Sequence, residues 1–305
     1  MLKNKLAGKK RTSGPIFCGI QMKLMLLPFI ILFTVFTVLP VVVSMGLSFF
    51  DYDVMLGAKW AGIKNYIYIF FEDDIFLIAL KNTLIFAVIT GPIGFFLSFL
   101  LAWFINEFNS YTRSILSFLF YSPALMGNAY YIWQILFSGD SYGYMNSMLI
   151  SLGIITEPIQ WLKTPQYILP IIIVVQLWMS MGISFLSNIA GLQNVDEELY
   201  EAGAIDGIKN RWFELWYITL PYMKNILLFS AVMQISASFS VGQLCITLAG
   251  FPSVNYSAET ILTHLTDVGT MRYEMGVACA MSFFLFALMG AARLLIGKVL
   301  SKVGS

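Results

Sequence analysis

Charged side chains are concentrated in one short stretch of the sequence, residues 194–221, which separates two long apolar segments. Eight acidic or basic residues fall in it: Asp196, Glu197, Glu198, Glu201, Asp206, Lys209, Arg211 and Glu214. The stretch is too short to form a domain of its own. Its charges therefore favour recognition chemistry, a surface that a soluble partner reads, and the other elements must present it to that partner.

No catalytic centre is predicted elsewhere. The pattern GxxxxGK[ST] of a phosphate-binding loop does not occur, so the chain itself is not expected to bind and hydrolyse ATP. His264 is expected to be an ordinary residue of the last external loop, because a single histidine cannot form a metal site or a histidine dyad. No nucleophile elbow surrounds a serine, and the three cysteines lie far apart. The sequence predicts neither an enzyme nor a metal centre.

Local signals predict how the charged stretch folds. Asn194 is a suitable N-cap with Glu197 three residues on, and carboxylates at 196–198 suit the positive end of a helix dipole. Helix-forming residues continue to Gly207, which can adopt the left-handed conformation that ends a helix. The small residues at 202–204 leave one helix surface nearly without side chains. We therefore expect the backbone of another protein to approach it closely.

The same residues carry a resemblance to a known family. Glu201-Ala202-Gly203, Asp206-Gly207 and Ile218-Thr219-Leu220-Pro221 resemble the EAA loop of bacterial ATP-binding-cassette (ABC) importer permeases, which reads EAA, three residues, Gly, nine residues and I-x-L-P. Gly203 departs from the motif's last Ala, and ten residues rather than nine separate Gly207 from Ile218. The form LYEA-x-x-IDG is similar to that of the carbohydrate branch, the family of the maltose and glycerol-phosphate permeases.

This resemblance implies a transport subunit rather than an enzyme. It implies that two cytoplasmic ABC ATPases, which hold ATP and magnesium, dock on the loop, and that the chain forms a heterodimer with a second permease. An extracytoplasmic binding protein would deliver a sugar or oligosaccharide, and no nucleic-acid partner is implied. The residues given an ATPase-coupling role are Glu198, Glu201, Ala202, Gly203, Asp206 and Gly207.

Composition predicts the class of elements that present the loop. The 305 residues are 58% hydrophobic and 11% charged, with a mean hydropathy of +0.78, as in an integral membrane protein. Apolar segments long enough to cross a bilayer recur near 24–50, 76–105, 113–138, 167–193, 220–249 and 274–297. Three of them contain helix breakers, Pro40, Gly91-Pro92 and Pro123, which spans tolerate when neighbouring helices satisfy the freed backbone groups. We expect an all-α fold of six kinked transmembrane helices with a cytoplasmic EAA coupling helix.

The distribution of Lys and Arg predicts the orientation. Thirteen of them fall on the side that holds the N-terminus and five on the other, which by the positive-inside rule places both termini in the cytoplasm. The basic segment 1–23 precedes a span too long for a signal peptide. Residues 24–305 are therefore expected to form one transmembrane domain, with the coupling loop at 194–219, in a bacterial cytoplasmic membrane.

Two external stretches extend the resemblance. Residues 60–66, WAGIKNY, are similar to a segment that follows the first span of sugar permeases. Between Ser138 and Gln166, the pattern from Gly143 to Trp161 is similar to the family's short amphipathic helix before a tryptophan.

Uncharged polar residues inside the spans predict the path of a solute. Mid-membrane acids and bases, which an ion-coupled carrier usually needs, are nearly absent, whereas amides, hydroxyls and aromatic rings suit the hydroxyls and C–H faces of a sugar. The positions that match the sugar contacts of maltose-type members are Gln176, Trp178, Gln234 and Ser238. One alternative is that such groups only hydrogen-bond helix to helix, as in a membrane scaffold. Others are an ion-coupled secondary carrier and an importer for a non-sugar solute.

Overall fold

The computed structural model describes residues 19–53 and 57–301, in two compact units divided after Gly46. In the first unit, helix α1 (Gly19–Phe33) continues through the π-helical turn η1 (Thr34–Val38) into α2 (Leu39–Leu47). The run Leu24–Leu47 is long and apolar enough to span a membrane. The helix begins before the predicted span start at residue 24, and the rest of the predicted basic segment, residues 1–18, lies outside the described residues.

The second unit contains a small hairpin and the remaining helices. Strands β1 (Phe50–Asp53) and β2 (Gly57–Trp60) pair antiparallel with Phe50 opposite Trp60, and they are the one departure from the predicted all-α fold among the described residues. The helices before residue 194 are α3 (Lys64–Phe71), α4 (Asp74–Asn106), α5 (Ser110–Leu125), α6 (Tyr131–Leu136), α7 (Tyr144–Ser151), α8 (Pro165–Met179) and α9 (Ile183–Gln193). The later elements are α10 (Glu197–Ile205), α11 (Arg211–Glu214), η2 (Leu215–Thr219), α12 (Leu220–Tyr222), α13 (Lys224–Phe239), α14 (Gly242–Ala249), η3 (Val254–Tyr256), α15 (Ile261–Thr266), η4 (Asp267–Met271) and α16 (Met275–Ser301).

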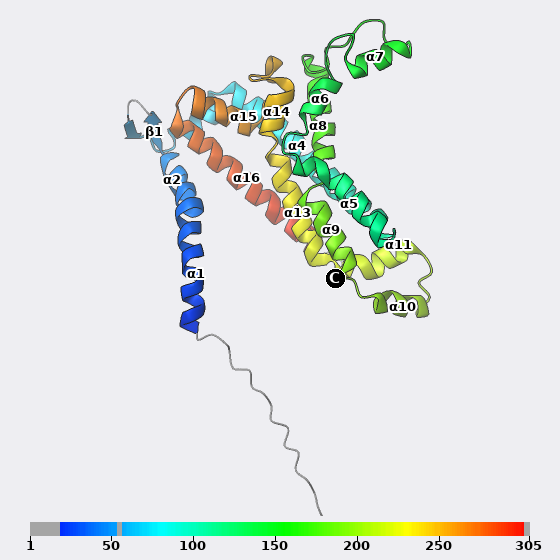
Figure 1. The fold of residues 1–305 in the computed structure, drawn as a ribbon. Helices are drawn as coiled ribbons and strands as arrows, with labels where there is room; N and C mark the ends of the chain where they lie inside the picture. The colour runs from blue at the N-terminus through cyan, green and yellow to red at the C-terminus, as the bar shows by residue number, and fades with distance from the viewer. Residues whose placement is uncertain (1–18, 54–56, 302–305) are drawn as a thin grey trace, which may run out of the picture. The chain divides into compact units, whose positions relative to one another are not determined.

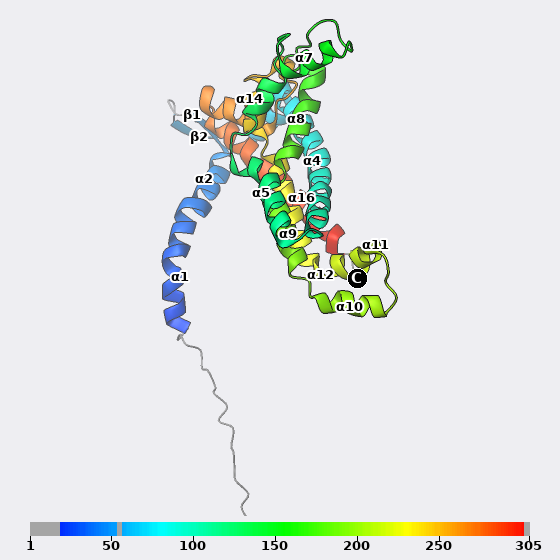
Figure 2. The same ribbon diagram turned by 45° about the vertical axis from the view of Figure 1, so that its right-hand side comes forward.

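Two segments of the second unit lie at opposite ends of its helix bundle. In both views α7 lies at one end, and α10 lies at the other end with α11 nearby (Figure 1 and Figure 2). Helices α4, α5, α9 and α13 occupy the space between these ends. The segment around α7 and the charged stretch would therefore face opposite sides of a membrane crossed by the bundle.

The helices differ in part from the six predicted spans. Among the described residues, those that could cross a membrane are Leu24–Leu47, Asp74–Asn106, Pro165–Gln193 and Met275–Lys298, with the bent pair Arg211–Tyr222 and Lys224–Phe239 as a fifth candidate. The predicted span 113–138 is not one helix, because α5 ends at Leu125 and α6 starts at Tyr131, with Gly127 at a φ of +40° between them. The predicted span 220–249 is interrupted between α13 and α14. The six-span arrangement stays a prediction.

Buried hydrogen bonds tie α4 to a distant part of the chain. The Asn82 amide donates to the carbonyl oxygens of three residues within 256–259, at 2.9–3.3 Å. The Thr83 hydroxyl accepts from the backbone N–H of Ile261 at 3.0 Å. Such bonds are costly to break in a low-dielectric interior. They hold the segment between α14 and α15 on the first half of α4.

The prediction that His264 is an ordinary loop residue is wrong. It lies on α15 with 1% of its surface exposed, and its Nε2 is 2.7 Å from Oδ2 of Asp73, the N-cap of α4. Burial alone would raise the pKa of Asp73, but the contact with His264 and the backbone N–H of Phe76 help to outweigh it and lower that pKa. The sequence does not indicate the contact between Asp73 and His264, because the two residues are 191 positions apart.

The predicted short helix before a tryptophan is present as α7, and one buried amide organises the segment around it. Asn146 donates to the carbonyl oxygens of Ser138, Asp140 and Ile159 at 3.0–3.2 Å. It accepts from the backbone N–H of Ile159 at 3.2 Å and from the indole N–H of Trp161 at 2.8 Å. The Asn146 side chain therefore holds together both ends of the segment that connects α6 to α8.

We expect Asn146→Ala to destabilise this segment by about 2–3 kcal/mol, because it leaves several buried polar groups unpaired. Hydrogen exchange of residues 138–164 in the purified protein should become faster. Ser147→Ala, at an exposed neighbouring position, is the matched control. Equal protection in the two variants would contradict the role given to Asn146.

Candidate functional site

The charged stretch begins with the short helix α10. It carries Glu197 and Glu198 in its first turn, where the helix dipole favours negative charge. Its N-cap is Asp196, so the prediction that Asn194 caps this helix is wrong. Asn194 instead ends α9, because its backbone N–H still bonds to the carbonyl oxygen of Gly191.

The end of α10 confirms the left-handed glycine predicted from the sequence. Gly207 has a φ of +93°. Its N–H bonds to the carbonyl oxygen of Ala204 at 3.2 Å, and the N–H of Ile208 bonds to that of Gly203 at 2.9 Å. These two bonds form a Schellman ending, which satisfies the last carbonyl groups of the helix.

The run of small residues at 202–204 predicted an open surface that includes Gly203. The structure contradicts this prediction for Gly203. It is buried, and a Cβ at this position would lie 2.6 Å from Cδ1 of Ile218 in the same chain. Its missing side chain lets η2 pack against α10. The other two small residues of the run, Ala202 and Ala204, are exposed, and so are Glu198 and Glu201.

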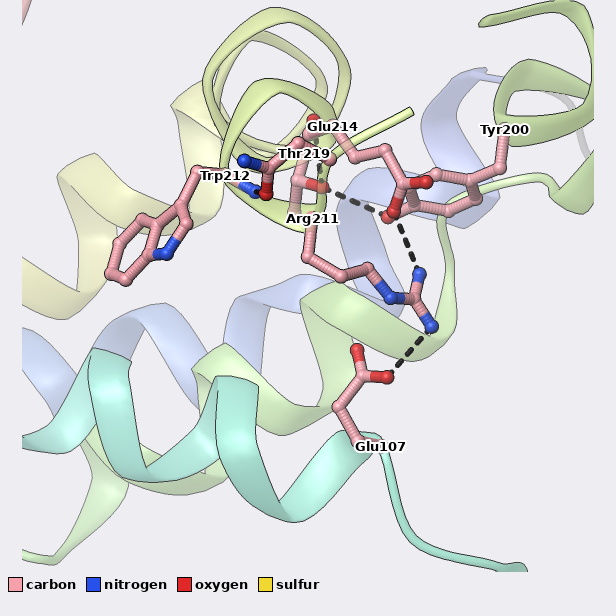
Figure 3. Close-up of polar contacts among 7 residues, drawn as sticks. Glu107, Tyr200, Arg211, Trp212, Glu214 and Thr219 are labelled. Atoms are coloured by element: carbon pink, nitrogen blue, oxygen red, sulfur yellow. Dashed lines mark hydrogen bonds and ion pairs between the residues drawn. The ribbon is translucent and has the colours of Figure 1, made fainter. Parts of the chain in front are cut away.

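The second half of the stretch is fixed to the end of α4. Arg211 lies between Glu107 and Glu214, with a nitrogen 2.7 Å from a carboxylate oxygen of each (Figure 3). The ring of Trp212 packs on that of Trp103 in α4, with centroids 5.2 Å apart. Exposed ion pairs contribute only about 0–1 kcal/mol each. Their main effect here is to set the position of α11 on α4.

The two halves of the stretch are also joined to each other. The Tyr200 hydroxyl of α10 hydrogen-bonds to the Thr219 hydroxyl at 2.9 Å, and Thr219 donates to the carbonyl oxygen of Glu214 at 3.3 Å (Figure 3). Thr219 is 2% exposed, so these bonds are largely protected from water. A cavity of about 460 Å³, lined in part by Tyr200, Arg113 and Arg211, lies at this junction. Helices α10, α11 and α4 thus form one connected assembly.

The four predicted substrate-path residues have different surroundings. Gln176 and Gln234 line a cavity of about 310 Å³ formed by α5, α8, α9 and α13, together with the break between α8 and α9. Ser238 is buried, and its hydroxyl donates to the backbone carbonyl of Gln234 at 2.8 Å. Trp178 packs edge to face on Trp133, with ring centroids 5.4 Å apart. A path role stays a prediction; of the four residues, Gln176 and Gln234 line this cavity.

Sequence reasoning missed the side chains that fix the charged stretch: Trp103, Glu107, Tyr200, Ile218 and Thr219. The opposite charges of Glu107 and Arg211 are an available signal, but the two residues are 104 positions apart and no spacing marks them as a pair. Within the part of the chain that the structure describes, no three His, Cys, Asp or Glu side chains are grouped to hold a metal ion.

Two proteins with an assigned role are similar in sequence to this chain over most of its length. It is 31% identical over 278 residues to the probable ABC transporter permease protein YesP of Bacillus subtilis (strain 168). The aligned residues cover 90% of this chain and 88% of that protein. The chain belongs to the permease subunits of ABC transporters. The permease is also similar to the lactose transport system permease protein LacF of Rhizobium radiobacter, with 30% identity over 229 residues, 74% of this chain and 75% of that one.

A solved structure shares the architecture of the permease. It is a bacterial ABC transporter involved in the import of the acidic polysaccharide alginate, with 25% sequence identity, a TM-score of 0.76, and coverage of 94% of this chain and 96% of that chain. No family profile matches the permease. The family predicted from the charged loop is confirmed, and its members are transport subunits rather than enzymes.

The contact between Gly203 and Ile218 gives a testable prediction. We expect Gly203→Leu to separate η2 from α10 at a cost of about 1–3 kcal/mol, because the larger side chain overlaps Ile218. Hydrogen exchange of residues 197–220 in the purified permease should become faster. Adding Ile218→Ala to that variant should restore protection by making room.

Ala202→Leu is the control, since Ala202 is exposed on the same helix. It should leave the exchange of this segment unchanged. The packing account is wrong if the double variant exchanges as fast as Gly203→Leu alone.

Proposed function

We propose that this permease is one of two transmembrane subunits of a sugar importer driven by separate ATPase subunits. The observation that carries the proposal is the exposed acidic helix α10, which is joined to α4 through η2 and α11 and presented at the end of the bundle opposite α7. A sugar or oligosaccharide solute is supported by the relatives named for lactose and alginate. The ion-coupled carrier considered above has no support among these relatives.

ATP and magnesium belong, in this proposal, to the partner ATPases. The sequence has no phosphate-binding loop, and the described residues hold no grouped metal ligands. This chain then contributes a contact surface and a connection, without chemistry of its own.

Helix α10 is the proposed docking element for an ATPase. Glu198 and Glu201 are exposed and form no ion pair with other described residues, so they are available to cationic side chains of a partner. When the ATPases close and move α10, its contacts with Ile218 and Thr219 carry the displacement to η2. The contacts of Arg211 then carry it to α4. Asp206 and Gly207 act by ending α10 at the correct point.

The membrane arrangement that fits this role has six spans with both termini in the cytoplasm. The segment around α7 then faces outward, where an extracytoplasmic binding protein would deliver the solute. A second permease would complete the translocation path against this chain. Within this chain, Gln176 and Gln234 would contribute polar groups to the path at their shared cavity.

Coupling is tested by changing the exposed face of α10. In proteoliposomes that contain the complete importer, we expect Glu201→Arg and Ala202→Trp each to lower ATP-dependent uptake by about tenfold or more, as loss of a central contact does. Both positions are exposed, so the permease pair should still assemble. Lys163→Ala, at an exposed site in the segment around α7, is the control. Full uptake by both variants would exclude docking through α10.

Orientation is tested by labelling in intact cells. In a cysteine-free background, Thr156→Cys should react with an impermeant thiol reagent, whereas Lys209→Cys should react only after the cells are permeabilised. Both side chains are exposed, so accessibility depends on the side of the membrane. The reverse pattern would overturn the orientation and the docking role together.

A further inference from the structure

We infer that the cavity formed by α5, α8, α9 and α13 selects an uncharged, hydroxyl-rich solute and excludes uronates, the sugars that carry carboxylates. The inference rests on the proposed sugar import and adds the charge class of the sugar. The relatives do not decide this class, because one is named for lactose, which is neutral, and another imports the acidic polysaccharide alginate.

The first observation is that the cavity lacks charged side chains. No Asp, Glu, Lys or Arg is among its described lining residues. In the four lining helices the only charged residues are Arg113 in α5 and Lys224 in α13. At 1.5 Å per residue, Lys224 lies about 15 Å along α13 from Gln234. A carboxylate in this cavity would lose its water without gaining a cation, which is strongly unfavourable.

The second observation is that the hydroxyl protons of two lining serines are already used. Ser180 donates to the carbonyl oxygen of Leu177 at 2.6 Å, and Ser184 donates to that of Ser230 at 3.0 Å. A serine hydroxyl has one proton to donate and two lone pairs that accept. Both oxygens can therefore only accept from a solute.

The two glutamines add to this bias. One amide N–H of Gln176 is bonded to the carbonyl oxygen of Ala237 at 3.2 Å, and one of Gln234 to that of Thr90 at 3.4 Å. Gly94 has no side chain at the place where the Gln234 amide meets α4. These contacts hold both amides in place and use half of their donors, while each keeps a carbonyl oxygen.

The side chains of Ser180, Ser184, Gln176 and Gln234 therefore offer this cavity more acceptors than free donors. Sugar hydroxyls can donate hydrogen bonds to such oxygens. A carboxylate can only accept, so it forms no hydrogen bond with them. The lining suits a neutral polyol and disfavours a uronate.

The test is equilibrium binding of two matched probes to the purified importer, without its binding protein. One probe is a radiolabelled oligogalacturonate, and the other is its fully methyl-esterified form, which has the same rings without the charge. Lactose is a second neutral probe. We expect a neutral probe to bind at least about tenfold more tightly than the uronate, a difference of about 1.4 kcal/mol.

Equal or tighter binding of the uronate would overturn the inference. So would uptake of sugar by an importer that binds none of the probes, since the path would then avoid this cavity. Absence of ATP-dependent uptake of any sugar with the binding protein present would instead reject the proposed function itself.

A variant that adds one cation tests whether this cavity is the selector. Met233→Lys, at a lining position, should raise the affinity for uronate relative to the methyl ester by about tenfold, because charge-assisted hydrogen bonds are stronger than neutral ones. Tyr121→Arg, which supplies the cation from α5, should act in the same way. Met148→Lys, on exposed α7, is the matched control. An unchanged ratio in both lining variants would overturn the inference.

Discussion

Hydrogen bonds and an ion pair along α4 tie it to three other parts of the second unit. The helix has 33 residues and is about 50 Å long. It holds the segment before α15 through Asn82 and Thr83, α13 through the carbonyl of Thr90, and α11 through Glu107. Inside a membrane an unpaired polar group costs several kcal/mol, so lipid cannot replace the buried contacts. A displacement applied at Glu107 therefore acts on one continuous helix that is also bonded to α13 and to the segment before α15.

Features of the charged stretch that depend on neighbouring residues could be predicted from sequence. The acidic first turn of α10 and its ending at Gly207 follow from helix dipole and glycine conformation, and both are present. Features that depend on distant residues could not. Asn194 does not cap α10 because it is the C-cap of α9, and Gly203 is buried because Ile218, fifteen positions later, occupies the space beside it. A local pattern carries no information about either contact.

The same limit applies inside the predicted spans. Composition identifies a helical membrane protein, since apolar length alone decides that class. It does not locate the interruptions near Gly127 and Ser240, where apolar residues continue across a change of backbone direction. Nor does residue type separate a solute contact from helix packing. Ser238 bonds to its own helix and Trp178 packs on Trp133, whereas Gln176 and Gln234 serve neighbouring helices and also line a cavity.

The break between α8 and α9 explains why a cavity exists at this level of the bundle. A helix interrupted within a membrane exposes backbone groups that need partners, and such breaks are tolerated where they line a cavity inside the protein. Ser180 and Gly182, at the break, both line the cavity, and the Ser180 hydroxyl satisfies a carbonyl of the preceding turn. Across the cavity, Gln234 connects α13 to α4. Any movement that the charged stretch transmits to α4 therefore also reaches the polar groups that line this cavity, so one set of helices can serve both coupling and selection.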